Sequence, residues 1–440
     1  MSLQSKNNSC LIAQYTVNIT IMSEDYLKYR YLQQFFPRSK RKKLVVLTGA
    51  RQTGKTTLVK SRYPELRYIN LDAPENRERL RTLSTGSWSQ TVGNAIIDEA
   101  QKEPVVFEKV KYAYDQGGIS FCMLLGSSQI LLLNKIRESL AGRVSLYELW
   151  PLLMCELLSS AGSRSASPPL VDCLFTQDKL DSILGSIPPL FLEESDSRLR
   201  DAENYLLQWG GMPALLPLSD TERWKWLKDY EYTYLERDLS DLARLDELQP
   251  FRTFQKLSAL RSGKLLNYSE LARDATVSVD TARRYLEYLR LSYQVILLQP
   301  YGQNLTSSIV KTPKLYWIDI GLLRQLGGMR SLLSGEIYET MVVTELYKWL
   351  KTAQRDGELF FYRTRSGLEL DILLKTEYGI IGIEVKGRKK IISSDIKAMK
   401  QIAHALGKEW RGGIVLYQGD EIRKLSEPAI WAVPSRRLFT

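Results

Sequence analysis

The sequence is poor in the residues that most often bind zinc or transfer protons near neutral pH. It contains one histidine, His404, and four cysteines, none of them spaced as C-x-x-C. The cysteines are Cys10, Cys122, Cys155 and Cys173. A structural zinc site is therefore excluded, and any metal or acid–base chemistry is expected to use carboxylates and lysines.

The sequence also lacks a long apolar run. No stretch approaches the roughly 20 apolar residues of a membrane span, and the apolar part of residues 10–22 is interrupted by Gln14 and Asn18. We therefore expect no membrane association and a cytoplasmic protein. Residues 1–24 are expected to be an N-terminal extension without an assigned role.

The length and the net charge indicate the number of domains and the kind of partner to expect. The 440 residues exceed what one core usually supports, so several domains are expected. With 61 Lys and Arg against 50 Asp and Glu, the net charge is +11, which favours a polyanionic partner such as nucleic acid. A mildly basic balance is also common among ordinary soluble proteins.

The chain predicts an α/β fold in several units. Apolar runs at residues 44–48, 68–71, 95–97 and 120–125, separated by helix-length segments, predict a parallel sheet in residues 25–158. Residues 159–245 are expected to be a helical linker or lid that begins with an exposed Ser-rich loop. Residues 246–310 resemble a winged helix-turn-helix, with helices at 268–273 and 279–291 and a wing strand at 295–299. Residues 311–440 return to α/β, with a helix at 337–350 and strands at 359–362, 370–375, 382–386 and 413–417.

A phosphate-binding loop follows the first apolar run. The segment GARQTGKTT matches G-x-x-x-x-G-K-[ST] between a predicted strand and a predicted helix. Its residues are Gly49, Ala50, Arg51, Gln52, Thr53, Gly54, Lys55, Thr56 and Thr57. Their backbone N–H groups are expected to hold ATP phosphates, with Lys55 on the β- and γ-phosphates and Thr56 on Mg²⁺.

A second nucleotide motif, NAIIDEAQ, ends a predicted strand with Asp98 and Glu99. We expect Asp98 to hold Mg²⁺ and Glu99 to act as the general base toward water, which predicts ATP hydrolysis. The alternative is a solvated acidic strand end. Ser127 or Ser128, after the next strand, could bond the attacking water or the γ-phosphate. Arg143 could neutralise the transferred phosphoryl group in its own chain or in a neighbour of a homo-oligomer, or it could be an ordinary surface arginine.

The order of GARQTGKTT, YINLDAP, IIDEAQ, LLGSSQ, SLAGRV and GGMPALL resembles the AAA+-type archaeal and bacterial ATPase family, in which a C-terminal domain of uncharacterised role follows the ATPase. The resemblance covers nearly the whole chain from about residue 25. It implies a P-loop core of the ASCE class, with Lys55, Thr56, Asp98 and Glu99 in these roles. The serine-rich insert around Ser163 departs from the compact version and leaves the domain border open.

A second group of charged residues lies in the C-terminal part. Asp371 ends one predicted strand, and Glu384 and Lys386 lie on the next, so the two carboxylates can share a divalent cation while the lysine positions a water. Glu339, on the preceding helix, could complete the oxygen ligands, and Mg²⁺ or Mn²⁺ is the expected metal. The structural alternative is a set of ordinary charged residues at strand ends.

This pattern resembles the PD-(D/E)xK nuclease superfamily, and in particular archaeal Holliday-junction resolvases. The resemblance implies that Glu339, Asp371, Glu384 and Lys386 bind metal and cleave DNA. The basic run at residues 387–390 and the arginines of the helix at 279–291 are expected phosphate contacts.

The leading interpretation is an ATP-dependent enzyme that processes duplex or branched DNA. One alternative is an ATP-dependent DNA-binding switch whose nuclease-like part is only a scaffold. Another is a regulatory ATPase that signals to a partner protein through its winged helix, since such a module also docks proteins.

Overall fold

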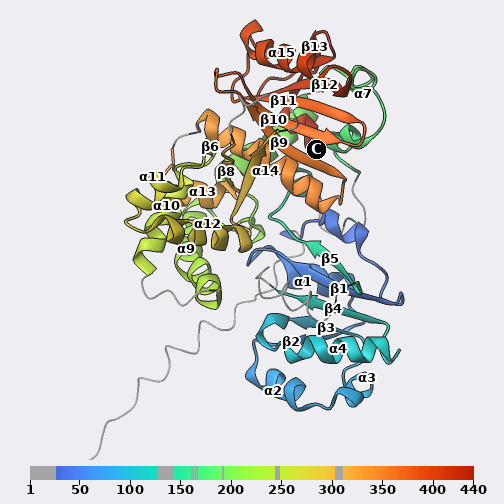
Figure 1. Ribbon diagram of the computed structural model, residues 1–440. Coiled ribbons are helices and arrows are strands. Elements are labelled where there is room, and N and C mark those ends of the chain that lie inside the picture. Colours follow the sequence, from blue (N-terminus) through green and yellow to red (C-terminus); the bar gives the residue numbers. More distant parts are fainter. Residues whose placement is uncertain are drawn as a thin grey trace, which may run out of the picture.

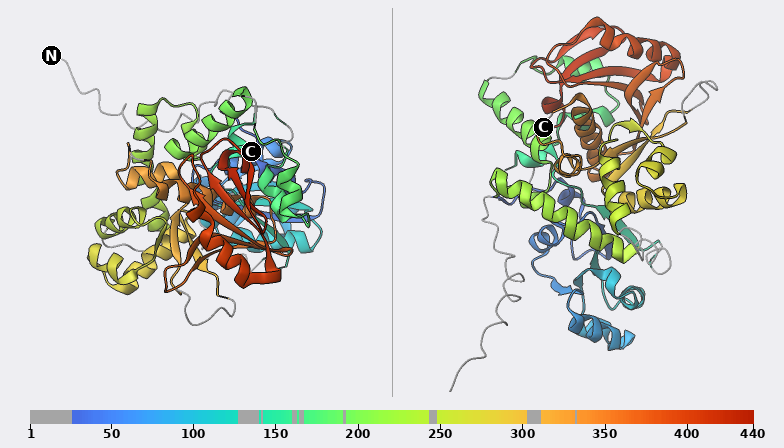
Figure 2. Two further views of the ribbon diagram at one scale, coloured as in Figure 1. Left: turned by 90° about the horizontal axis from the view of Figure 1, so that it is seen from above. Right: turned by 90° about the vertical axis from the view of Figure 1, so that its left-hand side faces the viewer.

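The structure is a computed structural model that describes residues 26–126, 140, 142–159, 163, 167–190, 193–242, 248–302, 311–331 and 333–440. Two sheets lie at opposite ends, and a helical region lies beside them (Figure 1). The same arrangement is seen from the side in the right panel of Figure 2. The expected N-terminal extension, residues 1–24, lies outside the described residues.

The first sheet has five strands in the order β2-β3-β4-β1-β5, and all of its pairings are parallel. This part of the chain contains the five strands and the helices around them: η2 (Tyr31–Phe35), β1 (Lys43–Thr48), α1 (Lys55–Arg62), β2 (Arg67–Asn70), α2 (Pro74–Thr82), η3 (Thr85–Ser87), α3 (Trp88–Thr91), β3 (Ala95–Asp98), η4 (Ala100–Lys102), α4 (Val105–Asp115), β4 (Phe121–Leu125), β5 (Val144–Glu148) and α6 (Met154–Leu157). The order places β4 between β1, which leads into the glycine loop, and β3, which ends in Asp98.

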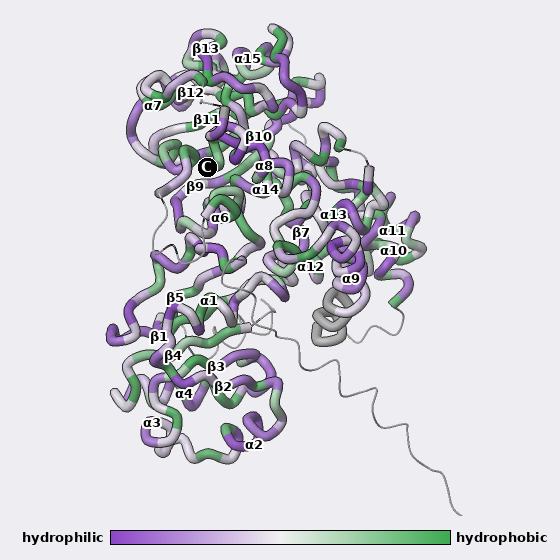
Figure 3. The backbone as a smooth tube through the Cα atoms, turned by 180° about the vertical axis from the view of Figure 1, so that it is seen from behind, coloured by the Kyte–Doolittle hydropathy of each residue, from purple (hydrophilic) through white to green (hydrophobic). Residues whose placement is uncertain are grey.

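Both faces of this sheet are buried, which explains the continuous apolar runs. Leu44 and Val46 face a core that includes Trp88 and Phe107, whereas Val45 faces a second core with α1. Parallel strands covered by helices on both faces require apolar residues at every position. Figure 3 shows that α2, in contrast, is mainly hydrophilic.

The helical region follows. It contains η5 (Leu170–Phe175), α7 (Leu180–Gly185), α8 (Glu193–Trp209), η6 (Pro213–Leu215), α9 (Asp220–Leu242), α10 (Leu248–Ala259), β6 (Lys264–Leu265), α11 (Tyr268–Asp274), α12 (Val279–Leu291), β7 (Val295–Pro300), β8 (Lys314–Trp317) and α13 (Ile320–Leu326). The side chains of Asn267 and Ser278 accept backbone N–H groups at the starts of α11 and α12. These caps fix both helices close to the residues at which the sequence predicts them.

The second sheet has nine strands in the order β13-β14-β12-β11-β10-β9-β7-β8-β6. Its remaining elements are α14 (Gly335–Thr352), β9 (Gly357–Arg363), β10 (Glu369–Thr376), β11 (Gly379–Lys386), η7 (Ser393–Ile396), α15 (Lys397–Leu406), η8 (Gly407–Glu409), β12 (Trp410–Tyr417), β13 (Arg423–Ser426), β14 (Ile430–Pro434) and α16 (Ser435–Leu438). Because β7 pairs in parallel with β9, the strand expected to be a wing is an interior strand of a sheet that continues past residue 310.

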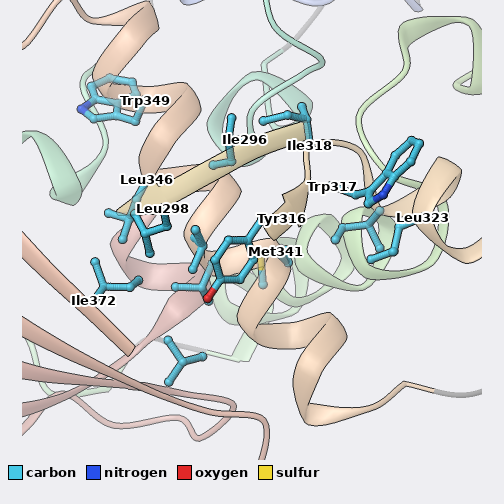
Figure 4. Close-up of a cluster of buried hydrophobic side chains, with 14 of the residues drawn as sticks. Ile296, Leu298, Tyr316, Trp317, Ile318, Leu323, Met341, Leu346, Trp349 and Ile372 are labelled. Atoms are coloured by element: carbon cyan, nitrogen blue, oxygen red, sulfur yellow. The ribbon is translucent and has the colours of Figure 1, made fainter. Parts of the chain in front are cut away.

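A shared core joins this sheet to the helical region. Tyr316 and Trp317 of β8 pack with Met341 of α14 and Ile372 of β10 in one buried cluster (Figure 4). The hairpin of β7 and β8 is therefore packed as part of the C-terminal unit.

Residues 210–213, with the sequence GGMP, make close backbone contacts with two distant parts of the chain, near Leu152 and near Asp319. The N–H group of Leu152, just after the first sheet, donates to the carbonyl of Gly211, and the N–H group of Gly211 donates to the Asp319 carboxylate. A Cβ atom at Gly211 would lie 2.5 Å from the Leu152 carbonyl oxygen. Only glycine fits this approach of two backbones.

We predict that Gly211→Ala destabilises the protein by about 1–3 kcal/mol, because the added methyl group forces two backbones apart. Thermal or denaturant unfolding measures the effect. Gly86→Ala is the matched control, since a Cβ atom at Gly86 meets nothing within 4 Å. Equal stability of the two variants would contradict these close backbone contacts.

Candidate functional site

The glycine loop has the backbone shape of a phosphate cradle. Gly49 and Gly54 take φ values of 146° and 90°, and Gln52 is also left-handed at 62°. A Cβ atom at Gly49 would lie 2.2 Å from the Leu149 carbonyl oxygen, so the loop requires glycine there. The ammonium of Lys55 donates to the Gly49 and Ala50 carbonyls at 2.8 Å each, which holds it over the loop. Backbone N–H groups at the start of α1 and this lysine fit the phosphates of a nucleotide.

The two residues expected to hold Mg²⁺ lie together. The Thr56 hydroxyl donates to Oδ2 of Asp98 at 2.6 Å, and Asp98 is buried. The Tyr68 hydroxyl, from β2, donates to the same oxygen at 2.7 Å. Burial and the neighbouring Asp98 carboxylate raise the pKa of Tyr68, so its phenol stays protonated and donates. A hydroxyl and a buried carboxylate at adjoining strand and helix ends form the oxygen donor set that Mg²⁺ prefers.

Glu99 lies at the end of β3 in a left-handed backbone conformation, with φ of 54°. This conformation is unfavourable for a residue with a side chain and is typical of functional sites. The Gln101 amide donates to Oε2 of Glu99 at 2.6 Å and fixes the carboxylate. Glu99 is thus held beside Asp98 as a candidate general base.

Arg30, which no sequence motif marks, also contacts the glycine loop. Arg30 donates to the carbonyl of Thr53 in the glycine loop and to the carbonyl of Trp150, at 2.6 Å each. Its Nε also pairs with the Glu156 carboxylate at 3.0 Å. Because Arg30 and Glu156 are 126 positions apart, no local pattern connects them.

Two tyrosines from the helical region also contact the loop and its strand. Tyr230 of α9 donates to the Arg51 carbonyl at 3.2 Å. Tyr293, which follows α12, bonds the Thr48 hydroxyl at 2.5 Å, one residue before the loop. The nucleotide loop is therefore in direct contact with elements far along the chain.

The other three candidate residues of the nucleotide site are Ser127, Ser128 and Arg143. Ser127 and Ser128 lie outside the described residues. Arg143 pairs with Asp115 at 2.8 Å and precedes β5, which runs parallel to β1. It therefore lies at the end of the strands away from the loop, about 20 Å from the loop along the strand. This placement does not fit a role toward its own nucleotide and leaves two of the expected alternatives, a role toward a neighbouring chain and an ordinary surface arginine.

The C-terminal carboxylates also lie close together. Ile372 pairs with Ile383, so Asp371 and Glu384 occupy opposed positions on β10 and β11. Oδ2 of Asp371 accepts the Val385 N–H group at 2.8 Å, and Oε1 of Glu384 accepts Lys386 Nζ at 2.6 Å. The other Glu384 oxygen, Oε2, is buried and has no hydrogen-bond partner within the described part of the chain.

The charges of these residues affect one another. Burial, followed by repulsion from Glu339 and Glu384, raises the pKa of Asp371 well above its usual range. Burial also raises the pKa of Glu384, although Lys386 partly opposes the shift. Neighbouring acids with raised pKa values are typical of functional sites.

Glu339 is engaged by residues of β8 that the sequence did not single out. Its Oε1 accepts the Tyr316 hydroxyl at 2.6 Å and pairs with Lys314 Nζ at 3.3 Å, while Lys314 also pairs with Glu369 at 2.8 Å. Among the described residues, no three His, Cys, Asp or Glu side chains are grouped so as to hold one metal ion. Glu339, Asp371 and Glu384 are thus close enough to affect one another's charge, but they are not grouped as three ligands of one metal ion.

Comparisons with known proteins match three segments of the chain. Residues 41–158 match the family described as an AAA domain. Residues 200–333 match a domain of unknown function, DUF8612, and residues 334–438 match another, DUF4143. Uncharacterised proteins of Mycobacterium bovis and Mycobacterium tuberculosis are 28% identical over 408 residues, which is 90% of this chain and 81% of theirs.

Solved structures share a more distant likeness. The Walker-type ATPase of Pyrococcus abyssi is 15% identical, with a TM-score of 0.39 over 64% of this chain and 90% of that chain. AMPPCP-bound DnaA from Aquifex aeolicus is 16% identical, with a TM-score of 0.22 over 57% of this chain and 84% of that chain. We draw no conclusion from likeness at this level.

The sequence match and the glycine loop together define the class. Residues 41–158 form an AAA-type P-loop ATPase domain, and this fold implies a nucleotide and usually Mg²⁺. No helix in the described ranges is long and apolar enough to cross a membrane.

We predict that Glu99→Gln binds ATP normally but hydrolyses it about 10²- to 10⁴-fold more slowly, because the general base is lost. Lys55→Ala should abolish turnover. Phosphate release and binding of a fluorescent ATP analogue measure the two properties. Glu108→Gln, on the exposed face of α4, is the matched control. Normal hydrolysis by Lys55→Ala would show that the nucleotide site is assigned wrongly.

Proposed function

We propose that this protein is an ATP-dependent enzyme that processes DNA. Mg²⁺-dependent ATP hydrolysis by residues 41–158 controls DNA binding, and the C-terminal domain cleaves duplex or branched DNA with Mg²⁺ or Mn²⁺. The AAA-type domain supports the ATPase half. The cleavage half is supported by the C-terminal carboxylates.

The proposed DNA cleavage rests on one arrangement of elements and residues in the C-terminal domain. Helix α14 is followed by the antiparallel strands β9, β10 and β11, then by α15 and by β12, which is parallel to β11. Asp371 and Glu384 lie opposite each other on β10 and β11, and a buried Glu384 oxygen has no partner in the described chain. A helix that carries Glu339, followed by strands that carry Asp371, Glu384 and Lys386, is the pattern on which the resemblance to PD-(D/E)xK nucleases rests.

The residues of this site suit phosphodiester cleavage. Asp371 and Glu384 would hold the metal ion, which when bound polarises the phosphate and activates water. Lys386, bonded to Glu384, lies where it can orient the attacking water. Glu339 belongs to the same cluster, since it pairs with Lys314 and its charge acts on Asp371.

Basic residues near this site and on α12 would contact the DNA backbone. Arg283 and Arg284 are exposed on α12, and Lys389 and Lys390 are exposed after β11. Arg290 is a weaker candidate, because its guanidinium pairs with Glu287 at 2.6 Å. The two successive helices α11 and α12, which match the predicted helix-turn-helix helices, and the net charge of +11 support DNA as the polyanion.

A second candidate function is an ATP-dependent DNA-binding or protein-regulatory switch that does not cleave. The contact of Lys314 with both Glu339 and Glu369 favours it, because these ion pairs would stabilise a scaffold. Arg143 would act in such a switch, or in the enzyme, only across the interface of a homo-oligomer.

We predict that full-length protein nicks linear or four-way DNA with Mg²⁺ or Mn²⁺ and that Asp371→Asn reduces nicking at least about 100-fold, because a metal ligand is lost. ATP hydrolysis should be unchanged in that variant. Nicking assays and phosphate release measure the two activities. Asp356→Asn, at an exposed position after α14, is the matched control.

Three outcomes would favour other functions or none. DNA-stimulated ATP hydrolysis without nicking would support the switch. ATP hydrolysis that is indifferent to nucleic acid would support a regulatory partner protein. Nicking that persists in Asp371→Asn would contradict the assigned cleavage site.

A further inference from the structure

Lys314 is a buried lysine at the centre of the C-terminal carboxylates. Its side chain is 4% exposed and lies 2.8 Å from Glu369 and 3.3 Å from Glu339. Burial alone would lower the pKa of Lys314, but the carboxylates of Glu339, Asp371 and Glu369 outweigh it and raise the pKa to about 12. The two ion pairs place the Lys314 ammonium among these acids.

Lys314 pairs directly with Glu339 and Glu369. Tyr316 also bonds Glu339, and Arg363 pairs with Glu369 at 3.2 Å. The other two carboxylates, Asp371 and Glu384, have one paired cation between them within the described chain, Lys386 on Oε1 of Glu384, and Oε2 of Glu384 has no hydrogen-bond partner there. Two carboxylates with one paired cation leave this half of the cluster short of positive charge.

A two-metal site needs carboxylates on both sides of the reacting phosphate. Here the oxygens that could serve a second metal ion, those of Glu339 and Glu369, already contact an ammonium. Because Lys314 extends from β8 of the large sheet, whose neighbouring Tyr316 is packed in the core, the lysine is held in place.

We propose that Lys314 takes the place of a second metal ion, so that the carboxylate cluster binds one divalent cation, between Asp371 and Glu384. The proposal deepens the proposed function and rests on its metal site. Lys314 is a positioning residue in this account. It sets the number of metal ions and stabilises Glu339 beside the site.

The test counts Mn²⁺ ions bound to the nucleotide-free, full-length protein, from the electron paramagnetic resonance signal of free Mn²⁺. Wild-type protein should bind one ion more than Asp371→Asn. Lys314→Met should bind one ion more than the wild type, because Glu339 and Glu369 are released. Differences between variants remove any contribution from the ATPase site.

Lys386→Met is the matched control, since Lys386 also pairs with a carboxylate of the cluster. It should leave the count unchanged. An unchanged count in Lys314→Met, or an equal gain in Lys386→Met, would overturn the proposal while the metal site stands. No difference between the wild type and Asp371→Asn would instead overturn the metal site itself, and the proposal with it.

Loss of a buried lysine can unfold the protein, because it leaves two carboxylates without a cation. If circular dichroism shows that Lys314→Met is unfolded, Lys314→Gln is measured instead, because its neutral amide can still donate to one of the two carboxylates. This variant also removes the ammonium from Glu339 and Glu369, so it should gain one ion over the wild type. A folded Lys314→Gln protein without this gain would overturn the proposal.

Discussion

The position of the nucleotide loop depends on one buried ion pair, between Arg30 and Glu156. Their side chains are 9% and 2% exposed, and Arg30 reaches Thr53 in the loop and Trp150 after the first sheet with its remaining nitrogens. Removal of one partner from such a pair costs about 3–5 kcal/mol, whereas an exposed pair contributes at most about 1 kcal/mol. The buried Arg30–Glu156 pair therefore stabilises the loop far more than the half-exposed Arg143–Asp115 pair stabilises the residues around it.

The segment held by this pair also contacts the C-terminal unit. The indole of Trp150 packs edge-on against Tyr293 and Tyr347, at 5.0 and 5.4 Å between ring centres. Glu345 of α14 accepts the N–H group of Met154, and the same helix carries Glu339 less than two turns earlier. A displacement of the loop is thus opposed by contacts with the helix that carries Glu339.

The sequence predicted those features whose cause is local. The glycine loop is a continuous motif, Asp98 ends a continuous apolar strand, and the helix at residues 279–291 begins at its own serine cap. Residues whose role depends on distant partners could not be predicted: Arg30 meets Glu156 across 126 positions. Lys314 is another example, since its partners Glu339 and Glu369 lie on separate elements, α14 and β10. Arg143 lies in the SLAGRV segment, which suggested a role at the nucleotide. Because β5 is parallel to β1, however, Arg143 lies at the end of the strands away from the glycine loop.

The energetic cost of the carboxylate cluster argues that it serves more than folding. Burial and mutual repulsion raise the pKa values of Asp371 and Glu384, so their ionised forms weaken the fold. Packed apolar residues at such positions usually give equal or greater stability than buried ions. A chain selected only for a stable sheet would have no reason to place four acids and two lysines on these strands and on α14. The cost is explained if two cations balance the acids: the Lys314 ammonium beside Glu339 and Glu369, and a divalent cation from solution beside Asp371 and Glu384.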